Sequence, residues 1–361
     1  MSLMKKILKN SSIANIAQLD KQELLLNAIN VQTPIPALNL AFSGQLDVGY
    51  GSDFMLLAGK SKSFKTFFAL IMAKAFLDKY DDSIVLFYDS EFGASSKYFE
   101  SIGIDPSRVA HIPIMDIEEF KFDLIKQVES IDAKTEKVFI LVDSIGNLAS
   151  KKEKETTLAE KSTVDLTRNR ELKSLSRMVT PYLKSKNIPM VCIAHTYADM
   201  SNPYGGEIVS GGRGIEYSAS TIFIVSKRQE KDGADLVGYQ FVITVEKSRY
   251  VREKSKIPIT VTFEGGIEKW SGLLEIALES GHVIKPSMGW YSRVNKTTGE
   301  VEEKKWRAKD TNSSEFWSAI FADKTFNEWI KNRYKIATKD MLSEEEEDAM
   351  IEASLIDSED E

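Results

Sequence analysis

Short apolar runs alternate with helix-like segments through the middle of the chain. The first predicted strands cover residues 54–58, 84–88, 137–142 and 188–194. They are continuously apolar, which is typical of parallel strands buried on both faces. The predicted helices between them cover residues 65–78, 94–102, 116–130 and 163–186. Alternation of this kind predicts an α/β core with a mostly parallel central sheet.

Three later strands follow one another with short turns such as Asp232-Gly233, which predicts an antiparallel end to the sheet. They are predicted at residues 221–225, 239–245 and 257–263. The character of the chain changes after Gly266, where tryptophans, turn signals and short helical segments indicate a small separate α/β module.

Apolar residues at helical spacing predict a helical N-terminal arm over residues 3–30. Pro34 and Pro36 are predicted to end it and to form a linker. Such an arm could pack on its own domain or on a neighbouring subunit. The domains we expect are an oligomerisation arm at 1–33, a core at 34–268, a small C-terminal domain at 269–340 and a tail at 341–361.

Composition excludes several classes of protein. Hydrophobic residues make up 42% and charged residues 28% of 361 residues, as in ordinary globular chains. No apolar run is long enough to span a membrane, so we expect no membrane association. The single cysteine, Cys192, cannot form a disulfide within the chain, and with three histidines it cannot make a common zinc site. We therefore expect a cytoplasmic protein.

The acidic net charge of −7 comes from the C-terminal tail. Residues 341–361 contain ten acidic and no basic side chains, and the rest of the chain carries 47 basic against 44 acidic residues. Such a block repels itself and is expected to be disordered. It could be a solubilising tail, or it could imitate a polyanion and compete for a basic groove.

The stretch from Gly59 to Thr66 has the layout of a phosphate-binding loop, because an apolar strand leads into small residues, Lys-Thr and a helix. Lys65 is expected to reach the β- and γ-phosphates of ATP, and Thr66 to place its hydroxyl on Mg²⁺. Phe64 stands where glycine is usual, and a simple turn is the alternative interpretation. The candidate nucleotide-contacting residues are Gly59, Lys60, Ser61, Lys62, Ser63, Phe64, Lys65, Thr66 and Phe67.

Polar residues directly follow the other predicted strands, and the carboxyl ends of parallel strands meet at one edge of a sheet. Asp143 could hold Mg²⁺, or it could cap the next helix. Glu91 is the candidate for orienting or deprotonating the attacking water, although a turn glutamate on the surface is the alternative. His195 could contact the γ-phosphate and report its presence, or act as a structural hydrogen-bond donor.

A glycine-rich stretch at 197–214 follows His195 and contains Tyr197, Tyr204 and Arg213. Aromatic and cationic side chains on such a loop suit single-stranded DNA. The mixed charges of 150–157 indicate a solvated loop. The basic segment 246–256 could be a solvated hairpin or a source of cations for a phosphate.

Several of these stretches together resemble the RecA-type recombinases, in particular the UvsX-type recombinases of T-even-type bacteriophages. The matching stretches are residues 57–66, 86–93, 142–153, 239–242, 245–249, 289–291 and 306–311. Phe64 itself is typical of UvsX-type loops. His195 departs from RecA, which has glutamine at this position.

The resemblance implies a RecA-like P-loop ATPase core that forms a helical filament on single-stranded DNA and pairs it with homologous double-stranded DNA. It implies that Glu91 is the catalytic carboxylate and that Asp143 binds on the metal side. Tyr98 would stack on adenine, and Lys247 and Arg249 would reach the ATP of the neighbouring protomer. Residues 150–162 and 196–213 would contact DNA, with Lys151, Lys152, Tyr197, Tyr204, Gly211, Gly212 and Arg213 as candidates.

The same resemblance implies that the arm docks on the next protomer, that the tail modulates DNA entry, and that single-strand-binding and mediator proteins are partners. A phage-encoded protein would work in the host cytoplasm. Two alternatives remain open. A hexameric helicase shares the core but usually has an extra N-terminal domain. A non-catalytic ATP-gated scaffold would keep Lys65 and Thr66 but not need Glu91.

Overall fold

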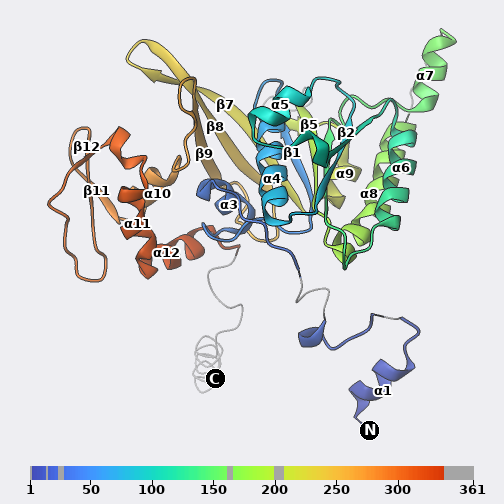
Figure 1. Ribbon diagram of the computed structural model, residues 1–361, viewed down its shortest axis with the longest axis horizontal. Coiled ribbons are helices and arrows are strands. Elements are labelled where there is room, and N and C mark those ends of the chain that lie inside the picture. Colours follow the sequence, from blue (N-terminus) through green and yellow to red (C-terminus); the bar gives the residue numbers. More distant parts are fainter. Residues whose placement is uncertain (1, 14, 23–27, 161–165, 199–206, 337–361) are drawn as a thin grey trace, which may run out of the picture.

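The computed structural model describes residues 2–13, 15–22, 28–160, 166–198 and 207–336. Its main feature is one large sheet with strand order β10-β9-β8-β7-β1-β5-β4-β2-β3 (Figure 1). The parallel strands are β1 (Phe54–Gly59), β2 (Ile84–Asp89), β3 (Val109–Pro113), β4 (Val138–Asp143) and β5 (Met190–Ala198). The α/β class with a mostly parallel core is therefore confirmed.

The far end of the sheet is antiparallel, as predicted. β7 (Thr221–Asp232) is parallel to β1 but antiparallel to β8 (Asp235–Lys247). β9 (Lys256–Thr262) and β10 (Gly266–Ile267) continue the antiparallel order, and the short β6 (Glu207–Val209) pairs with β5. The sequence-based strand assignment missed β3, which is a short and largely exposed edge strand.

Helices cover both faces of the parallel strands. α4 (Lys65–Lys79) lies on one face, and α6 (Ile117–Ser130) and α8 (Thr167–Lys186) lie on the other (Figure 1). Successive side chains of β1 enter different hydrophobic clusters, with Leu57 facing α4 and Leu56 facing α6 and α8. This explains the continuous apolar runs, because neighbouring positions on these strands point to opposite buried faces.

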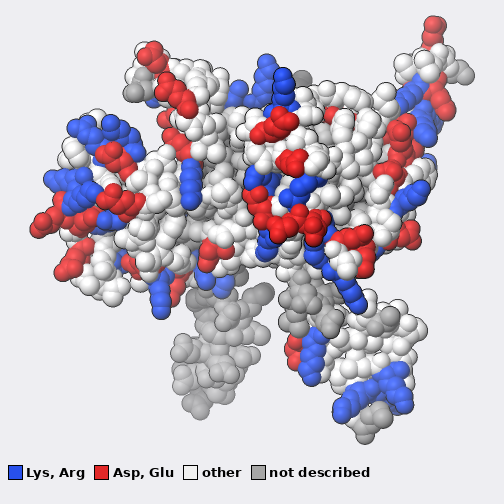
Figure 2. Space-filling model, viewed as in Figure 1, with Lys and Arg blue, Asp and Glu red and all other residues white. Residues whose placement is uncertain are grey.

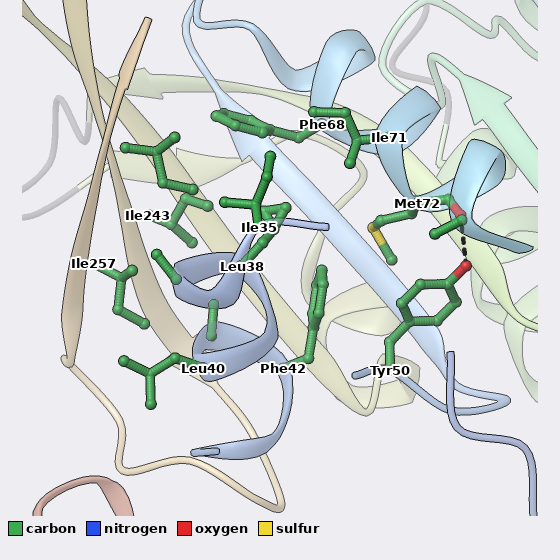
Figure 3. Packing of buried hydrophobic residues seen from close by; sticks show 14 of the residues in the cluster. Ile35, Leu38, Leu40, Phe42, Tyr50, Phe68, Ile71, Met72, Ile243 and Ile257 are labelled. Carbon is green, nitrogen blue, oxygen red and sulfur yellow. Dashed lines mark hydrogen bonds between the residues drawn. The ribbon is translucent and has the colours of Figure 1, made fainter. Parts of the chain in front are cut away.

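The predicted linker at Pro34 and Pro36 is wrong, because α3 (Pro36–Ser43) begins there. Proline is well tolerated in the first turn of a helix, where its missing N–H has no partner to lose. Seven of the eight residues of α3 are buried. Figure 3 shows Leu38 and Phe42 among other core side chains, and the Tyr50 hydroxyl donates a hydrogen bond of 2.6 Å to the carbonyl oxygen of Met72.

The continuous helix predicted over residues 3–30 is also wrong. The described part of this region contains only α1 (Leu3–Asn10) and one 3-10 turn, Leu19–Lys21. The backbone becomes extended at Ser11, and α1 has no buried residue. It lies apart from the body at the bottom of Figure 1.

The remaining short helices of the core are α5 (Ser96–Ser101), α7 (Lys151–Leu158) and α9 (Arg213–Ser218). α7 corrects the expectation of a loop at 150–157. Ser150 caps it by accepting the N–H of Glu153, so the mixed charges belong to an exposed helix.

The chain after residue 268 forms short strands and helices, and its assignment as a separate domain at 269–340 stays a prediction. It contains β11 (Val283–Ser287), β12 (Trp290–Arg293) and β13 (Trp306–Arg307), with α10 (Leu273–Glu279), α11 (Ser314–Ala322) and α12 (Lys324–Tyr334). Its buried side chains, such as Trp306 and Phe316, belong to the same hydrophobic cluster as α3 and α4. Figure 2 shows basic and acidic side chains interspersed over this module, at the left. In the described part of the chain, no helix combines the length and apolarity needed to cross a membrane.

Candidate nucleotide-binding site

The predicted phosphate loop joins the carboxyl end of β1 to the first turn of α4. Gly59 is required sterically, since a Cβ there would lie 2.4 Å from the carbonyl oxygen of Val225. Lys62 and Phe64 have positive φ angles of 60° and 68°. A loop of this type turns successive N–H groups toward one point and leads into a helix N-terminus, an arrangement that favours anions.

Packing explains why a phenylalanine occurs at position 64. The Phe64 ring stacks on Phe241 of β8, with centroids 4.7 Å apart and planes 15° apart. It also contacts Phe67, at 4.4 Å between centroids. These contacts compensate for a left-handed backbone conformation that disfavours any side chain with a Cβ. Phe67 therefore helps to hold the Phe64 ring, and with it the loop, in place.

Lys65 and Thr66 lie at the start of α4 and face the end of β4. The ammonium group of Lys65 donates to the carbonyl oxygens of Gly59 and Lys60, at 3.0 and 2.9 Å. Burial lowers the pKa of Lys65, while the carboxylates of Asp143 and Glu91 oppose that shift. The Thr66 hydroxyl donates to Asp143 Oδ2 at 2.7 Å.

Thr66 and Asp143 offer the oxygen ligands that Mg²⁺ prefers. Burial raises the pKa of Asp143 to about 6, and the nearby carboxylates of Glu91 and Asp89 add to this shift. A divalent cation would favour the charged form. Within the described residues, no cluster of three or more His, Cys, Asp or Glu side chains could hold a metal alone, so the remaining ligands would come from phosphate oxygens and water.

Glu91 and His195 meet, as expected for side chains at neighbouring strand ends. His195 Nε2 lies 3.0 Å from Glu91 Oε1 and carries the proton, because a carboxylate oxygen can only accept. Asn147 Nδ2 donates to the same oxygen at 3.1 Å. Burial alone would raise the pKa of Glu91, but the hydrogen bond and charge of His195, together with Lys65, lower it below its ordinary value.

Sequence reasoning missed the residues that position Glu91. Asp89 Oδ1 accepts the backbone N–H groups of Glu91 and Phe92, at 3.0 and 2.7 Å, and fixes the turn after β2. His111 on β3 bonds the other carboxylate oxygen at 3.0 Å. The aspartate at the start of this turn was a usable signal for the backbone bonds. Nothing in the sequence pointed to Asn147 or His111.

Tyr98 lies on α5 and is half buried against the hydrophobic cluster that includes α4. Burial raises the pKa of its hydroxyl, and the charge of Asp143 adds to the shift. Its role in adenine stacking stays a prediction.

The candidate DNA-contacting residues occupy two segments. Lys151 and Lys152 are exposed on α7. Tyr197, with 53% of its surface exposed, is on the extension of β5 beyond His195. Tyr204 and the acidic tail lie outside the described residues, and so does the side chain of Arg213.

Gly211 and Gly212 have positive φ angles of 114° and 77° and lead into α9, so their backbone conformation alone accounts for glycine here. The second segment also contacts the phosphate loop. Lys60 Nζ lies 3.5 Å from Glu207 of β6, and Glu207 accepts a hydrogen bond from Thr196.

Lys247 lies away from the phosphate loop of its own chain, and Arg249 follows it just after the end of β8. β8 runs antiparallel to β7, so that Phe241 is level with the phosphate loop whereas Lys247 pairs with Ile222, beside the middle of β1. Lys247 Nζ donates to the carbonyl oxygens of Glu216 and Tyr217, at 2.8 and 3.0 Å. Burial lowers its pKa, and the charge of Arg249 adds to the shift.

The chain is similar in sequence to known recombination proteins of phages and bacteria. Residues 270–330 match the family model for the C-terminal domain of the bacteriophage T4 recombination and repair protein. The chain is 45% identical over 359 residues to the recombination and repair protein of Enterobacteria phage T4, covering 98% of this chain and 91% of that relative.

More distant similarity extends to RecA proteins. The chain is 26% identical over 237 residues to protein RecA of Malacoplasma penetrans, covering 64% of this chain and 69% of that relative. For protein RecA of Mycoplasma mycoides the identity is 26% over 226 residues, covering 60% of this chain and 61% of that relative.

Proposed function

Because the chain belongs to the family of the phage T4 recombination and repair protein, we propose that it is an ATP-dependent recombinase that exchanges DNA strands within a filament. The observation that carries the proposal is the convergence of Lys65, Thr66, Asp143, Glu91 and His195 at one edge of the sheet. Phosphoryl transfer needs a phosphate-binding loop, a carboxylate that binds the metal and a base, and these residues could supply all three.

In this proposal the loop and Lys65 bind the phosphates of ATP, and Thr66 and Asp143 hold Mg²⁺. The bound metal would neutralise charge on the phosphates. Glu91 accepts the proton of the attacking water, and the hydrogen bond that its backbone N–H donates to Asp89 Oδ1 fixes the position of its backbone. Tyr98 contacts the base.

In this proposal filament assembly completes the site, because β8 carries Lys247, with Arg249 following it in sequence, to the level of Ile222 rather than to the phosphate loop of its own chain. We propose that they bind the γ-phosphate of ATP held by a neighbouring protomer. ATP would then stabilise the contact between protomers, and the contact would strengthen ATP binding, since the two effects are thermodynamically linked.

The N-terminal arm supplies a second contact between protomers. Leu3, Ile7 and Ile13 are each more than half exposed, and α1 buries no residue on its own chain. Exposed apolar side chains on a projecting segment favour docking on another protein surface. We propose the next protomer as that surface.

Single-stranded DNA would bind the segments around α7 and around β6, which begin just after β4 and β5. Lys151 and Lys152 would contact phosphates, and Tyr197 would contact bases. Sequence would be recognised by pairing with the homologous duplex. The partners in this proposal are single-stranded and double-stranded DNA, further copies of this chain, and single-strand-binding and mediator proteins of the host-cell cytoplasm.

ATP hydrolysis measured with and without single-stranded DNA, together with strand exchange on homologous and heterologous duplexes, tests the proposal. We expect DNA-stimulated hydrolysis and exchange only with the homologous duplex. Stimulated hydrolysis with closed rings and unwinding in electron micrographs would instead support the hexameric helicase, which the matches to recombination proteins do not favour. Binding of ATP without hydrolysis would support the scaffold.

A further inference from the structure

Two side chains from different segments bind the same oxygen of Glu91. Asn147 Nδ2 and His195 Nε2 lie 3.1 and 3.0 Å from Oε1. Asn147 follows β4 and precedes α7, whereas His195 lies on β5 and precedes β6. Glu91 is therefore tied to the start of each proposed DNA-contacting segment.

The segment that carries Asn147 is attached to the N-terminal end of α8. Arg168 donates to the carbonyl oxygens of Ile145, Gly146 and Leu148, at 2.9, 3.1 and 2.6 Å. The bonded carbonyl groups lie both before and after Asn147 in the sequence. α7 follows Leu148 by a few residues, so a displacement of α7 or of the first turn of α8 would move Asn147 with it.

The segment that carries His195 is attached to Ser210, the residue that follows β6. Ser210 N donates to the carbonyl oxygen of His195 at 2.8 Å, and His195 N donates to Ser210 Oγ at 3.1 Å. The two segments also approach closely, since a Cβ on Gly146 would lie 3.0 Å from Ser210 Oγ and 3.2 Å from His195 Cδ2.

We propose that Asn147 is a positioning residue that restrains Glu91 and keeps ATP hydrolysis slow until DNA displaces the segment after β4. This inference rests on the proposed function, because it assigns a role to Asn147 only if Glu91 is the base. A carboxylate oxygen that already accepts two hydrogen bonds is a weaker acceptor for the proton of water and is less free to turn toward it. Release of the amide would free that oxygen.

The test measures ATP hydrolysis by the full chain without DNA and with saturating single-stranded DNA. For Asn147→Ala we expect the rate without DNA to rise about tenfold, the equivalent of one hydrogen bond to a charged group. The rate with DNA should stay within about twofold, so that stimulation by DNA shrinks by the same factor. A merely structural defect would lower both rates together.

Asn147→Asp preserves the side-chain volume and replaces the donor by a carboxylate, which repels Glu91. We expect a rise in the rate without DNA at least as large as for the alanine variant. Asn332→Ala, the same chemical change on the exposed surface of α12, is the control and should leave both rates unchanged. Thermal melting of all variants identifies any loss of folding, and if alanine unfolds the chain, the aspartate variant decides.

Folded variants whose rate without DNA is unchanged or lower would overturn the inference. The outcome for Glu91→Gln separates this failure from failure of the proposed function. If Glu91→Gln abolishes hydrolysis while the Asn147 variants behave like the wild type, only the restraint is wrong. If Glu91→Gln hydrolyses ATP normally, the proposed base itself is wrong.

Discussion

The two halves of the large sheet carry different parts of the candidate site. The parallel strands β1, β2, β4 and β5 end at one edge, and the residues that follow them meet there within one chain. The antiparallel strand β8 passes this edge at Phe241. It ends at Lys247, level with the middle of β1 but separated from it by β7, and Arg249 follows shortly after.

Under the proposed function, this difference would let one fold combine a site within a chain with a contact between chains. Parallel strands place all their carboxyl ends together, so each can add a polar group to one ligand site. An antiparallel partner returns toward the opposite edge, so cations at its end lie away from the ligand site of their own chain. Phe64 joins the halves, because its ring stacks on Phe241.

The largest expected effect comes from the parallel half. Lys65→Ala should abolish ATP binding and filament formation, because the only buried ammonium directed at the described part of the phosphate loop is lost. Fluorescent-nucleotide binding and electron microscopy measure these two results. Strand exchange at the wild-type rate would refute the site.

Glu91→Gln should lower hydrolysis by about 10²–10⁴-fold, the usual range for a general base. ATP binding and assembly should survive, since glutamine keeps the shape of the side chain and an acceptor oxygen for Asn147. Single-turnover hydrolysis and sedimentation with DNA measure the two properties. Near-normal turnover would move the catalytic role to another residue.

Much of this half was predictable from sequence. Continuous apolar runs identified β1, β2, β4 and β5, and the residue after each run identified Lys65, Glu91, Asp143 and His195 as neighbours. The physical reason is that strand burial leaves a local signal and that parallel strands share one edge. The RecA-type resemblance added Lys247 and Arg249, which local patterns could not assign to another protomer.

The rest depended on tertiary contacts without a local signal. Asn147 and Glu91 are 56 residues apart in sequence, and their hydrogen bond follows only from how β2 and β4 pair. The exposed edge strand β3 has no apolar run to reveal it. Pro34 and Pro36, before and at the first residue of α3, were compatible with both a linker and a helix start, and only the burial of the helix decides between them.

The antiparallel half is tested by Arg249→Ala, which should lower DNA-stimulated hydrolysis by roughly 100-fold. This is less than the 10³–10⁵-fold of an arginine finger, because Lys247 remains. Arg249 is chosen since Lys247 also holds the backbone of α9, at 2.8 and 3.0 Å. Hydrolysis is measured at saturating DNA.

Mixing distinguishes a role within a chain from a role between chains. Arg249→Ala protomers retain Lys65, and Lys65→Ala protomers retain Arg249. Mixed filaments should therefore recover part of the activity at junctions where an intact Lys65 on one protomer meets an intact Arg249 on its neighbour. No recovery, in filaments that incorporate both variants, would contradict the assignment of Arg249 to a neighbour's ATP.

The smallest expected effect concerns the contact between the halves. Phe64→Ala removes the ring that stacks on Phe241 yet keeps a Cβ at φ 68°. Phe64→Gly removes the same ring and also the left-handed strain, which costs about 1–2 kcal/mol per residue. Glycine should therefore leave the protein about 1 kcal/mol more stable than alanine, the reverse of their order at an ordinary position. Urea denaturation of both variants measures the difference, with Phe64→Leu as the control that retains apolar volume at the same φ.

If alanine proves as stable as glycine, the loop does not keep its left-handed conformation without the ring, and packing on β8 rather than the loop sequence sets its shape.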